Sequence, residues 1–477
     1  MKHYLIRTFV PLKNNGMKDG DLGRDKIDFG NGKISKVFLA LFFPTLVGMI
    51  FNSALTIIDG VFVGQGVNAD GIASVNIVAP LFMVATGIGL MFGIGSSVIA
   101  SIRLSEDNVK AARIILTQAF IVGLLIISLI IIGCTCFSEN VLQLLGCSDR
   151  LLPYATDYLL WLQPGLFFLF IQCVGMMLIR LDGSPKYAMW VQIIAAVINI
   201  VLDWYMIFPL GWGVMGAALA TSIACTIGGL LVLSYFIWFH DRLRFYRLKM
   251  SVTSLLLTVR NARYMMKIGS ATFITELAMS VMMLTGNYMF MSMLNEEGVA
   301  AYAIACYLFP LVFSISNAVA QSAQPIISYN YGAHNAWRVS RALRVSLYTA
   351  MICGTIVASG LWTADHIIVS MFLRPDEAAY PLAINGLPLF STCAVFFAIN
   401  IAFIGYYQSI ERVVASTFYT LLRGVILLVP CFIILPRIIG VAGLWLSIPM
   451  AELLTSMIIG INYIRLRISH KRHAIRA

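Results

Sequence analysis

The second half of this chain repeats the first half in register, at an offset of about 227 residues. Gly71-Ile-Ala-Ser74 matches Gly298-Val-Ala-Ala301, and Gly213-Val-Met-Gly216 matches Gly440-Val-Ala-Gly443, both without a gap. A repeat of this kind indicates that one structural unit occurs twice. Residues that one half has and the other lacks are therefore the first place to look for function.

Both repeats are hydrophobic enough to lie in a membrane. Hydrophobic residues make up 60% of the chain and charged residues only 12%, which is far from the composition of a soluble globular domain. Twelve apolar segments are each long enough to cross a hydrocarbon core of about 30 Å as a helix. They lie at about 37–63, 71–101, 113–134, 153–179, 188–209, 213–239, 266–293, 298–329, 342–364, 381–407, 415–435 and 440–464. The sequence predicts an all-α integral membrane protein of twelve transmembrane helices in two six-helix repeats.

The formal net charge of +11 reflects topology more than a nucleic-acid partner. Lys and Arg gather in the N-terminal segment, the middle of the chain, the C-terminal tail and every second loop. The intervening loops carry only Arg150, Arg374 and Arg437. The positive-inside bias then predicts cytoplasmic termini and an even number of spans. We expect a monomeric, multi-pass protein of the plasma (inner) membrane, with its two repeats in the same orientation.

The ends of the predicted spans divide the chain into five parts. They are a cytoplasmic N-terminal segment (1–35), an N-lobe (36–239), a cytoplasmic connector (240–265), a C-lobe (266–464) and a cytoplasmic tail (465–477).

Acidic residues within the spans are the strongest functional candidates, because an ionised side chain at mid-bilayer costs at least about 2.5–3.5 kcal/mol. Asp59 and Asp203 lie about 9 and 12 Å from the outer side at helical rise. Asn199 precedes Asp203 by four residues and shares its helix face. Together with the Thr221 hydroxyl and a backbone carbonyl near Ala217, they offer hard oxygen ligands for a small cation such as Na⁺.

Two other interpretations of these residues stay open. Two close carboxyl groups can instead share a proton. Alternatively, Asp59 only ends its helix, and Asn199 and Asp203 only form interhelical hydrogen bonds. The repeat argues against a scaffold role, because the matching residues of the second half are mostly apolar: Asn287, Ile426, Pro430 and Ile448. We therefore predict a single cation site that belongs to the N-lobe.

The second half has charged residues of its own. Arg423 and Glu452 lie at similar depth near the midplane, so we expect a structural ion pair in preference to a role in transport. Glu276 is open between helix packing and substrate contact. In the first span, Pro44 removes a helix hydrogen bond and softens the segment, which suggests a gate, although prolines also occur in ordinary transmembrane helices.

Enzyme motifs are missing from the sequence. It has no Gly-rich phosphate loop followed by Lys, no Cys or His spacing typical of a metal site and no Gly-x-Ser-x-Gly elbow. We expect neither enzymatic activity nor a cofactor, apart from a coupling ion.

In this order, several motifs resemble the multidrug and toxic compound extrusion (MATE) transporters over about residues 35–465. They are Pro44, Asp59-Gly-Val-Phe-Val-Gly64, Asn199-Ile-Val-Leu-Asp203, Gly216-Ala-Ala-Leu-Ala-Thr221 and Gln324-Pro-Ile-Ile-Ser-Tyr-Asn-Tyr-Gly332. The resemblance implies two six-helix lobes that face each other across a central cavity. It also implies export of small organic cations in exchange for Na⁺ or H⁺.

The resemblance assigns roles to individual residues. The family's cation-binding groups and its bending proline correspond to Asp59, Asn199, Asp203, Thr221, the carbonyl of Ala217, and Pro44. Glu276 resembles an acidic residue of the seventh helix in one branch of the family, whereas other branches place theirs at a different spacing.

The alternative is a flippase for lipid-linked glycans or lipids from the same wider superfamily. Such a protein needs basic residues along its cavity to bind a pyrophosphate. Almost every Lys and Arg of this chain is instead predicted to lie in cytoplasmic loops. A structural or receptor-like membrane subunit would leave the one-sided acidic cluster unexplained.

Overall fold

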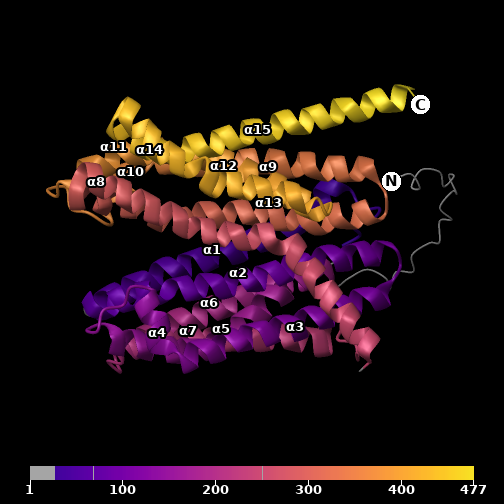
Figure 1. Cartoon of the computed structure of the whole chain (residues 1–477), viewed down its shortest axis with the longest axis horizontal. Coiled ribbons are helices and arrows are strands. Elements are labelled where there is room, and N and C mark those ends of the chain that lie inside the picture. Colours follow the sequence, from indigo (N-terminus) through magenta and orange to yellow (C-terminus); the bar gives the residue numbers. More distant parts are fainter. Residues whose placement is uncertain (1–26, 68, 250, 477) are drawn as a thin grey trace.

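The computed structural model describes residues 27–67, 69–249 and 251–476, and these residues form helices and no strands. Figure 1 shows two helical bundles side by side, one from each half of the chain. The N-lobe comprises α1 (Ile34–Gly66), α2 (Ala69–Ser105), α3 (Val109–Cys136), α4 (Ser138–Leu144), α5 (Leu152–Leu181), α6 (Pro185–Ile207), α7 (Gly213–Ser234) and the π-helix η1 (Tyr235–Phe239). The C-lobe comprises α8 (Val252–Gly332), α9 (Ala336–Thr363), α10 (Asp365–Ser370), α11 (Ala379–Ser391), α12 (Cys393–Ser409), α13 (Val413–Leu421), the π-helix η2 (Leu422–Ile426), α14 (Leu428–Ile439) and α15 (Val441–Arg476).

The 81-residue helix α8 consists of two arms, 252–294 and 296–332. Between them Asn295 has φ 52° and ψ −152°, a backbone conformation that no helix contains. Eleven helices in the described residues are long and apolar enough to span a membrane, with α8 counted once. Counting its arms separately gives 11 + 1 = 12 spans. The prediction of an all-α membrane protein with twelve helices in two repeats is therefore confirmed.

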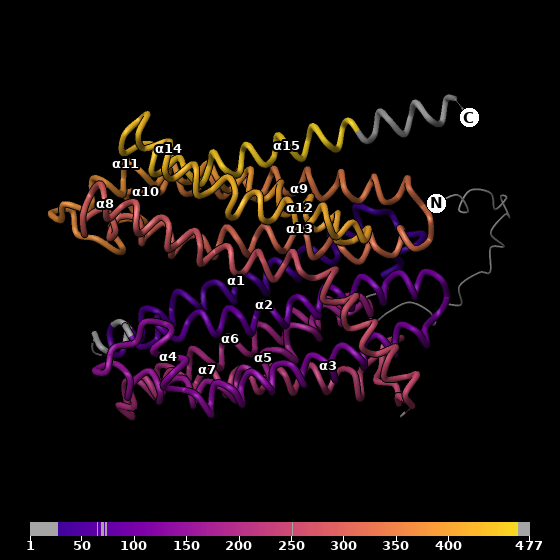
Figure 2. Tube along the Cα trace, viewed as in Figure 1, coloured from indigo at the N-terminus to yellow at the C-terminus, as the bar shows by residue number. Residues whose placement is uncertain are grey.

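The two lobes exchange parts of their helices. The beginning of α1, including Phe38 and Phe42, packs in a hydrophobic core with α8, α9 and α12 of the C-lobe. Conversely, the beginning of α8, including Met265 and Ile268, packs in the core of the N-lobe. Figure 2 shows both crossings: the indigo start of α1 lies among orange helices, and the start of α8 reaches the purple bundle.

Glycines allow α2 and α8 to touch where they cross. A Cβ atom on Gly95 would lie 2.1 Å from the Met265 carbonyl oxygen, and one on Gly269 would lie 2.0 Å from that of Met91. Any side chain at either position would push the helices apart. The small residues therefore fix the closest approach of the two lobes.

The predicted connector, residues 240–265, is partly helical, because α8 begins at Val252. Its first part is fixed to the N-lobe by Asp182, in the turn between α5 and α6. The Asp182 carboxylate accepts hydrogen bonds from the backbone N–H groups of Asp241, Arg242 and Leu243 at 2.7–2.9 Å. We call this end of the molecule, where α5 ends and α6 and α8 begin, the connector end.

Candidate cation-binding site

Helices α1 and α6 bring the predicted ligands together. The two helices run in the same direction in close contact, since a Cβ on Gly48 would meet the Gln192 side chain and one on Gly66 would meet Ile207. This packing places Asp59 of α1 against the face of α6 that carries the other two predicted ligands.

The carboxyl groups of Asp59 and Asp203 lie in hydrogen-bonding contact. Asn199 donates a hydrogen bond through Nδ2 to Oδ2 of Asp203, one helical turn further along α6. Asp203 has 0% exposure, and the Oδ1 atoms of both aspartates are buried without a hydrogen-bond partner. Asp59 itself is half-buried. The structure thus joins three of the predicted site residues in one largely buried cluster.

Charge in this cluster is not balanced by the protein. In the part of the chain that the structure describes, no Lys or Arg pairs with either aspartate. Two buried carboxylates side by side require a proton or a cation between them, because burying an uncompensated charge is very costly. The two unpartnered Oδ1 atoms and the amide oxygen of Asn199 suit a small cation, which prefers oxygen ligands.

Helix α5 contributes a residue that the sequence did not single out. Tyr158 is buried and lies within electrostatic range of Asp59, Asp203 and Cys225. Among 19 tyrosines in the chain, nothing in the spacing of this one marks it. Its phenol places a polar group beside the carboxyl pair.

Two further predicted ligands lie on α7, which packs against α6. Ala217 is buried and Thr221 is half-buried. No contact joins the Thr221 hydroxyl to the carboxyl pair in the described residues. Cys225, one turn beyond Thr221 on α7, lies within electrostatic range of Tyr158.

Pro44 lies inside α1, which continues as one helix from Ile34 to Gly66. On one side of the proline, residues up to Phe42 pack against the C-lobe. On the other side, the helix packs against α6 of the N-lobe from Gly48 onward. The proline therefore lies where α1 passes from one lobe to the other.

Glu276 belongs to the first arm of α8 but lies against the N-lobe. Its Cβ is 3.5 Å from the position of a Cβ built on Gly87 of α2, and its carboxyl lies near Cys173 of α5. The side chain is buried, and no hydrogen bond to it is found within the described ranges. Among the described residues, no hydrogen bond or ion pair links Glu276 to the Asp59–Asp203 cluster.

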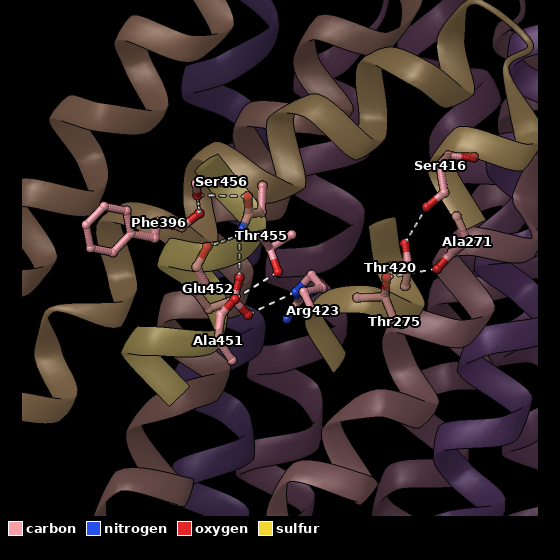
Figure 3. Close-up of polar contacts among 11 residues, drawn as sticks. Ala271, Thr275, Phe396, Ser416, Thr420, Arg423, Ala451, Glu452, Thr455 and Ser456 are labelled. Carbon is pink, nitrogen blue, oxygen red and sulfur yellow. Dashed lines mark hydrogen bonds and ion pairs between the residues drawn. The ribbon is translucent and has the colours of Figure 1, made fainter. Parts of the chain in front are cut away.

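Arg423 and Glu452 form an ion pair within the C-lobe (Figure 3). Arg423 donates through Nε to Oε1 of Glu452 at 2.9 Å, and Asn400 donates to Oε2 of Glu452 at 2.7 Å. The guanidinium also lies over the ring of Phe397, 4.3 Å from its centroid. The two predicted partners thus meet in a buried network whose net charge is zero, and its amide and aromatic members were not predicted.

Polar contacts between the lobes gather toward the connector end. Ser101 of α2 donates to the Pro325 carbonyl at 3.3 Å, and Arg180 of α5 donates to Oε1 of Gln321 at 2.5 Å. Near the middle of α1, Ser53 donates to Ser314 at 2.7 Å. Beyond Ser53, the described residues of α1 make no hydrogen bond with the C-lobe. Figure 1 shows the two bundles diverging in the same direction, away from the connector end.

Comparisons with known proteins agree with this architecture. The family model described as MatE matches residues 44–205 and 271–433, which are the two repeats. The chain is 25% identical over 431 residues to the multidrug export protein MepA of Staphylococcus saprophyticus, covering 90% of this chain and 93% of that protein. It is also 25% identical over 442 residues to an FAD transporter of Shewanella oneidensis, covering 90% and 94%.

A solved structure shares the fold over almost the whole chain. It is an outward-facing conformation of a multidrug resistance MATE family transporter, with a TM-score of 0.86 at 21% identity. The similarity covers 94% of this chain and 98% of the other. Since the family model matches more than half of the sequence, the chain belongs to the MatE family of membrane transporters, the multidrug and toxic compound extrusion proteins.

Proposed function

We propose that this protein is a secondary active antiporter that exports small organic cations in exchange for inward-moving Na⁺ or H⁺. The observation that carries the proposal is the uncompensated acidic cluster of Asp59, Asp203 and Asn199. Such a cluster attracts a cation from either side of the membrane, and its two carboxylates cannot both remain ionised without one.

Competition for one cluster explains the coupling. If a bound Na⁺ or proton weakens binding of the organic cation, linkage requires the organic cation to weaken binding of the ion by the same factor. Entry of the ion from outside then favours release of the drug. Tyr158 lies within electrostatic range of both carboxyl groups, and aromatic rings attract cations.

Alternating access follows from the way in which the lobes touch. We assign the connector end to the cytoplasm, because the basic loops gather there. Inter-lobe contacts close that end, and the bundles diverge toward the other, which corresponds to an outward-open state. To open the cytoplasmic end, α1 must bend between its two attachments, and Pro44 lies between them.

The relatives support export but leave the substrate class to experiment. The MepA relative is a multidrug exporter, whereas the Shewanella relative carries FAD, a substrate with a negatively charged pyrophosphate. A pyrophosphate requires free cationic groups in the cavity. The buried Arg423 is neutralised by Glu452, and no Lys or Arg pairs with the acidic cluster in the described residues. The charges around the candidate site itself therefore favour a cationic substrate.

Efflux from proteoliposomes tests this function. A fluorescent organic cation is loaded, and Na⁺ and pH gradients are imposed separately. We expect one of the two gradients to drive efflux through the wild-type protein and neither to drive it through Asp203→Asn. Efflux that is independent of both gradients would contradict the proposal. FAD loaded in the same way tests the second substrate class.

A further inference from the structure

A buried arginine connects the two lobes at the connector end. Arg180 lies in the last turn of α5, next to a predicted cytoplasmic loop, yet its exposure is only 2%. Its Nη1 donates to Oε1 of Gln321, a C-lobe side chain with 5% exposure, at 2.5 Å. Its Nε atom has no partner, and no carboxylate pairs with it in the described part of the chain.

The energetics of this contact depend on how close the lobes are. A guanidinium is normally buried only with acceptors that replace its water, and the Gln321 oxygen is the only oxygen within bonding distance of Arg180 among the described residues. When the lobes part at this end, water takes the place of Gln321. Removing one partner of a buried, charged hydrogen bond is therefore much more costly to the closed state than removing both.

The hydrogen bond between Arg180 and Gln321 has no counterpart at the matching positions of the internal repeat. Gln408 matches Arg180 (408 − 180 = 228), and Ile94 matches Gln321 (321 − 94 = 227). Gln408 does not bond to Ile94: it donates to the Ile268 carbonyl at 3.2 Å and to Thr272 at 2.9 Å, both in the first arm of α8. No buried charge takes part in these bonds. Gln321, Gln408 and Ile94 line the same cavity of about 30 Å³, which is room for a water molecule or two.

We propose that the hydrogen bond between Arg180 and Gln321 is a latch that holds the connector end closed and breaks in each transport cycle. The inference rests on the proposed alternating access. Arg180 acts as a positioning residue, because it sets the balance between the two states without contacting the acidic cluster.

The latch is tested by measuring the distance between the lobes. Nitroxide labels are attached at Lys110→Cys on α3 and Ala336→Cys on α9, both exposed positions at the connector end, with the exposed Cys136 replaced by Ser. Pulsed dipolar spectroscopy then gives the populations of the closed and open states. The measurement requires no transport, so failure of the proposed antiport would be distinguishable from failure of the latch.

We expect Gln321→Leu to raise the ratio of open to closed protein at least about tenfold, since it leaves a buried guanidinium without an oxygen acceptor. The double variant Arg180→Met/Gln321→Leu should return to the wild-type ratio, because neither polar group remains. Gln408→Leu is the matched control: Gln408 lines the same cavity, but its removal leaves no buried charge without an acceptor, so it should leave the ratio unchanged.

Three results would overturn the latch. They are a wild-type ratio in Gln321→Leu, a double variant as open as the single one, and equal opening in Gln408→Leu. If Gln321→Leu does not yield folded protein, Gln321→Asn replaces it, because its shorter side chain also withdraws the acceptor from Arg180.

Discussion

The N-lobe and the C-lobe share a fold, but the acidic pair Asp59 and Asp203 of the first and Glu452 of the second are partnered in opposite ways. In the N-lobe, Asp59 and Asp203 meet without a basic partner, and two of their oxygens have no hydrogen-bond donor. In the C-lobe, Glu452 is neutralised by Arg423 and receives a second hydrogen bond from Asn400. On the account proposed above, the balanced network serves as scaffold and the unbalanced one binds a cation from outside the protein.

Removing either acid of the N-lobe should have the largest effect on transport. We expect Asp59→Asn and Asp203→Asn each to reduce ion-coupled efflux to background at near-normal expression, because each change removes charge and conserves shape. Since both residues hold the same cation, the double variant should be little worse than either single one. Initial efflux rates per amount of protein measure this, and additive losses or full activity of one single variant would rule out a shared site.

Breaking the ion pair of the C-lobe should instead reduce the amount of folded protein. Arg423→Ala leaves Glu452 buried and uncompensated, which costs about 3–5 kcal/mol. We expect little folded protein by size-exclusion chromatography, and a matching loss in Glu452→Ala. The double variant Arg423→Met/Glu452→Leu should recover much of it. Stable Arg423→Ala protein with an altered range of substrates would show that this network takes part in transport.

Two neutral residues, Asn199 in the N-lobe and Asn287 in the C-lobe, allow a comparison with a smaller expected effect. Asn199→Ala removes one oxygen from the cation site, so we expect the ion concentration for half-maximal efflux to rise about tenfold, equivalent to about 1.4 kcal/mol, at an unchanged maximal rate. Asn287 occupies the position of Asp59 in the second repeat and is exposed. Asn287→Ala should leave ion dependence unchanged, and an equal shift in both variants would mean that both lobes bind the ion.

The two helices that cross between the lobes, α1 and α8, give the prediction with the smallest expected effect. Pro44 of α1 matches Thr272 of α8, at an offset of 228. If bending of α1 is specific to the proline, Pro44→Ala should lower the maximal efflux rate several-fold with little change in ion affinity, whereas Thr272→Ala should not. Equal rates for wild type and Pro44→Ala would remove the proline from the mechanism.

Repetition and hydrophobic patterning were enough to predict the twelve spans, because each span must satisfy its backbone hydrogen bonds as a helix. The same arguments selected Asp59, Asn199 and Asp203, since charge in a membrane is rare. They did not find Tyr158, which resembles any other aromatic residue of a span. They also predicted that almost every Lys and Arg lies in a cytoplasmic loop, and Arg180 is buried instead. Hydropathy at the end of a span does not reveal which side chains turn inward. The exchange of helix ends between lobes depends on contacts between distant segments, such as Gly95 with Met265.

Counting the bound ions tests most directly whether the coupling ion binds only in the N-lobe. Purified wild-type protein is equilibrated with radioactive Na⁺, or with protons in weak buffer, and a saturating organic cation is then added. The amount of ion released per chain is measured for wild type, Asp203→Asn and Asn287→Ala. We predict that one ion per chain is released from wild type and from Asn287→Ala and that none is released from Asp203→Asn. Release of two ions per chain, or release that persists in Asp203→Asn, would contradict a single cation site in the N-lobe.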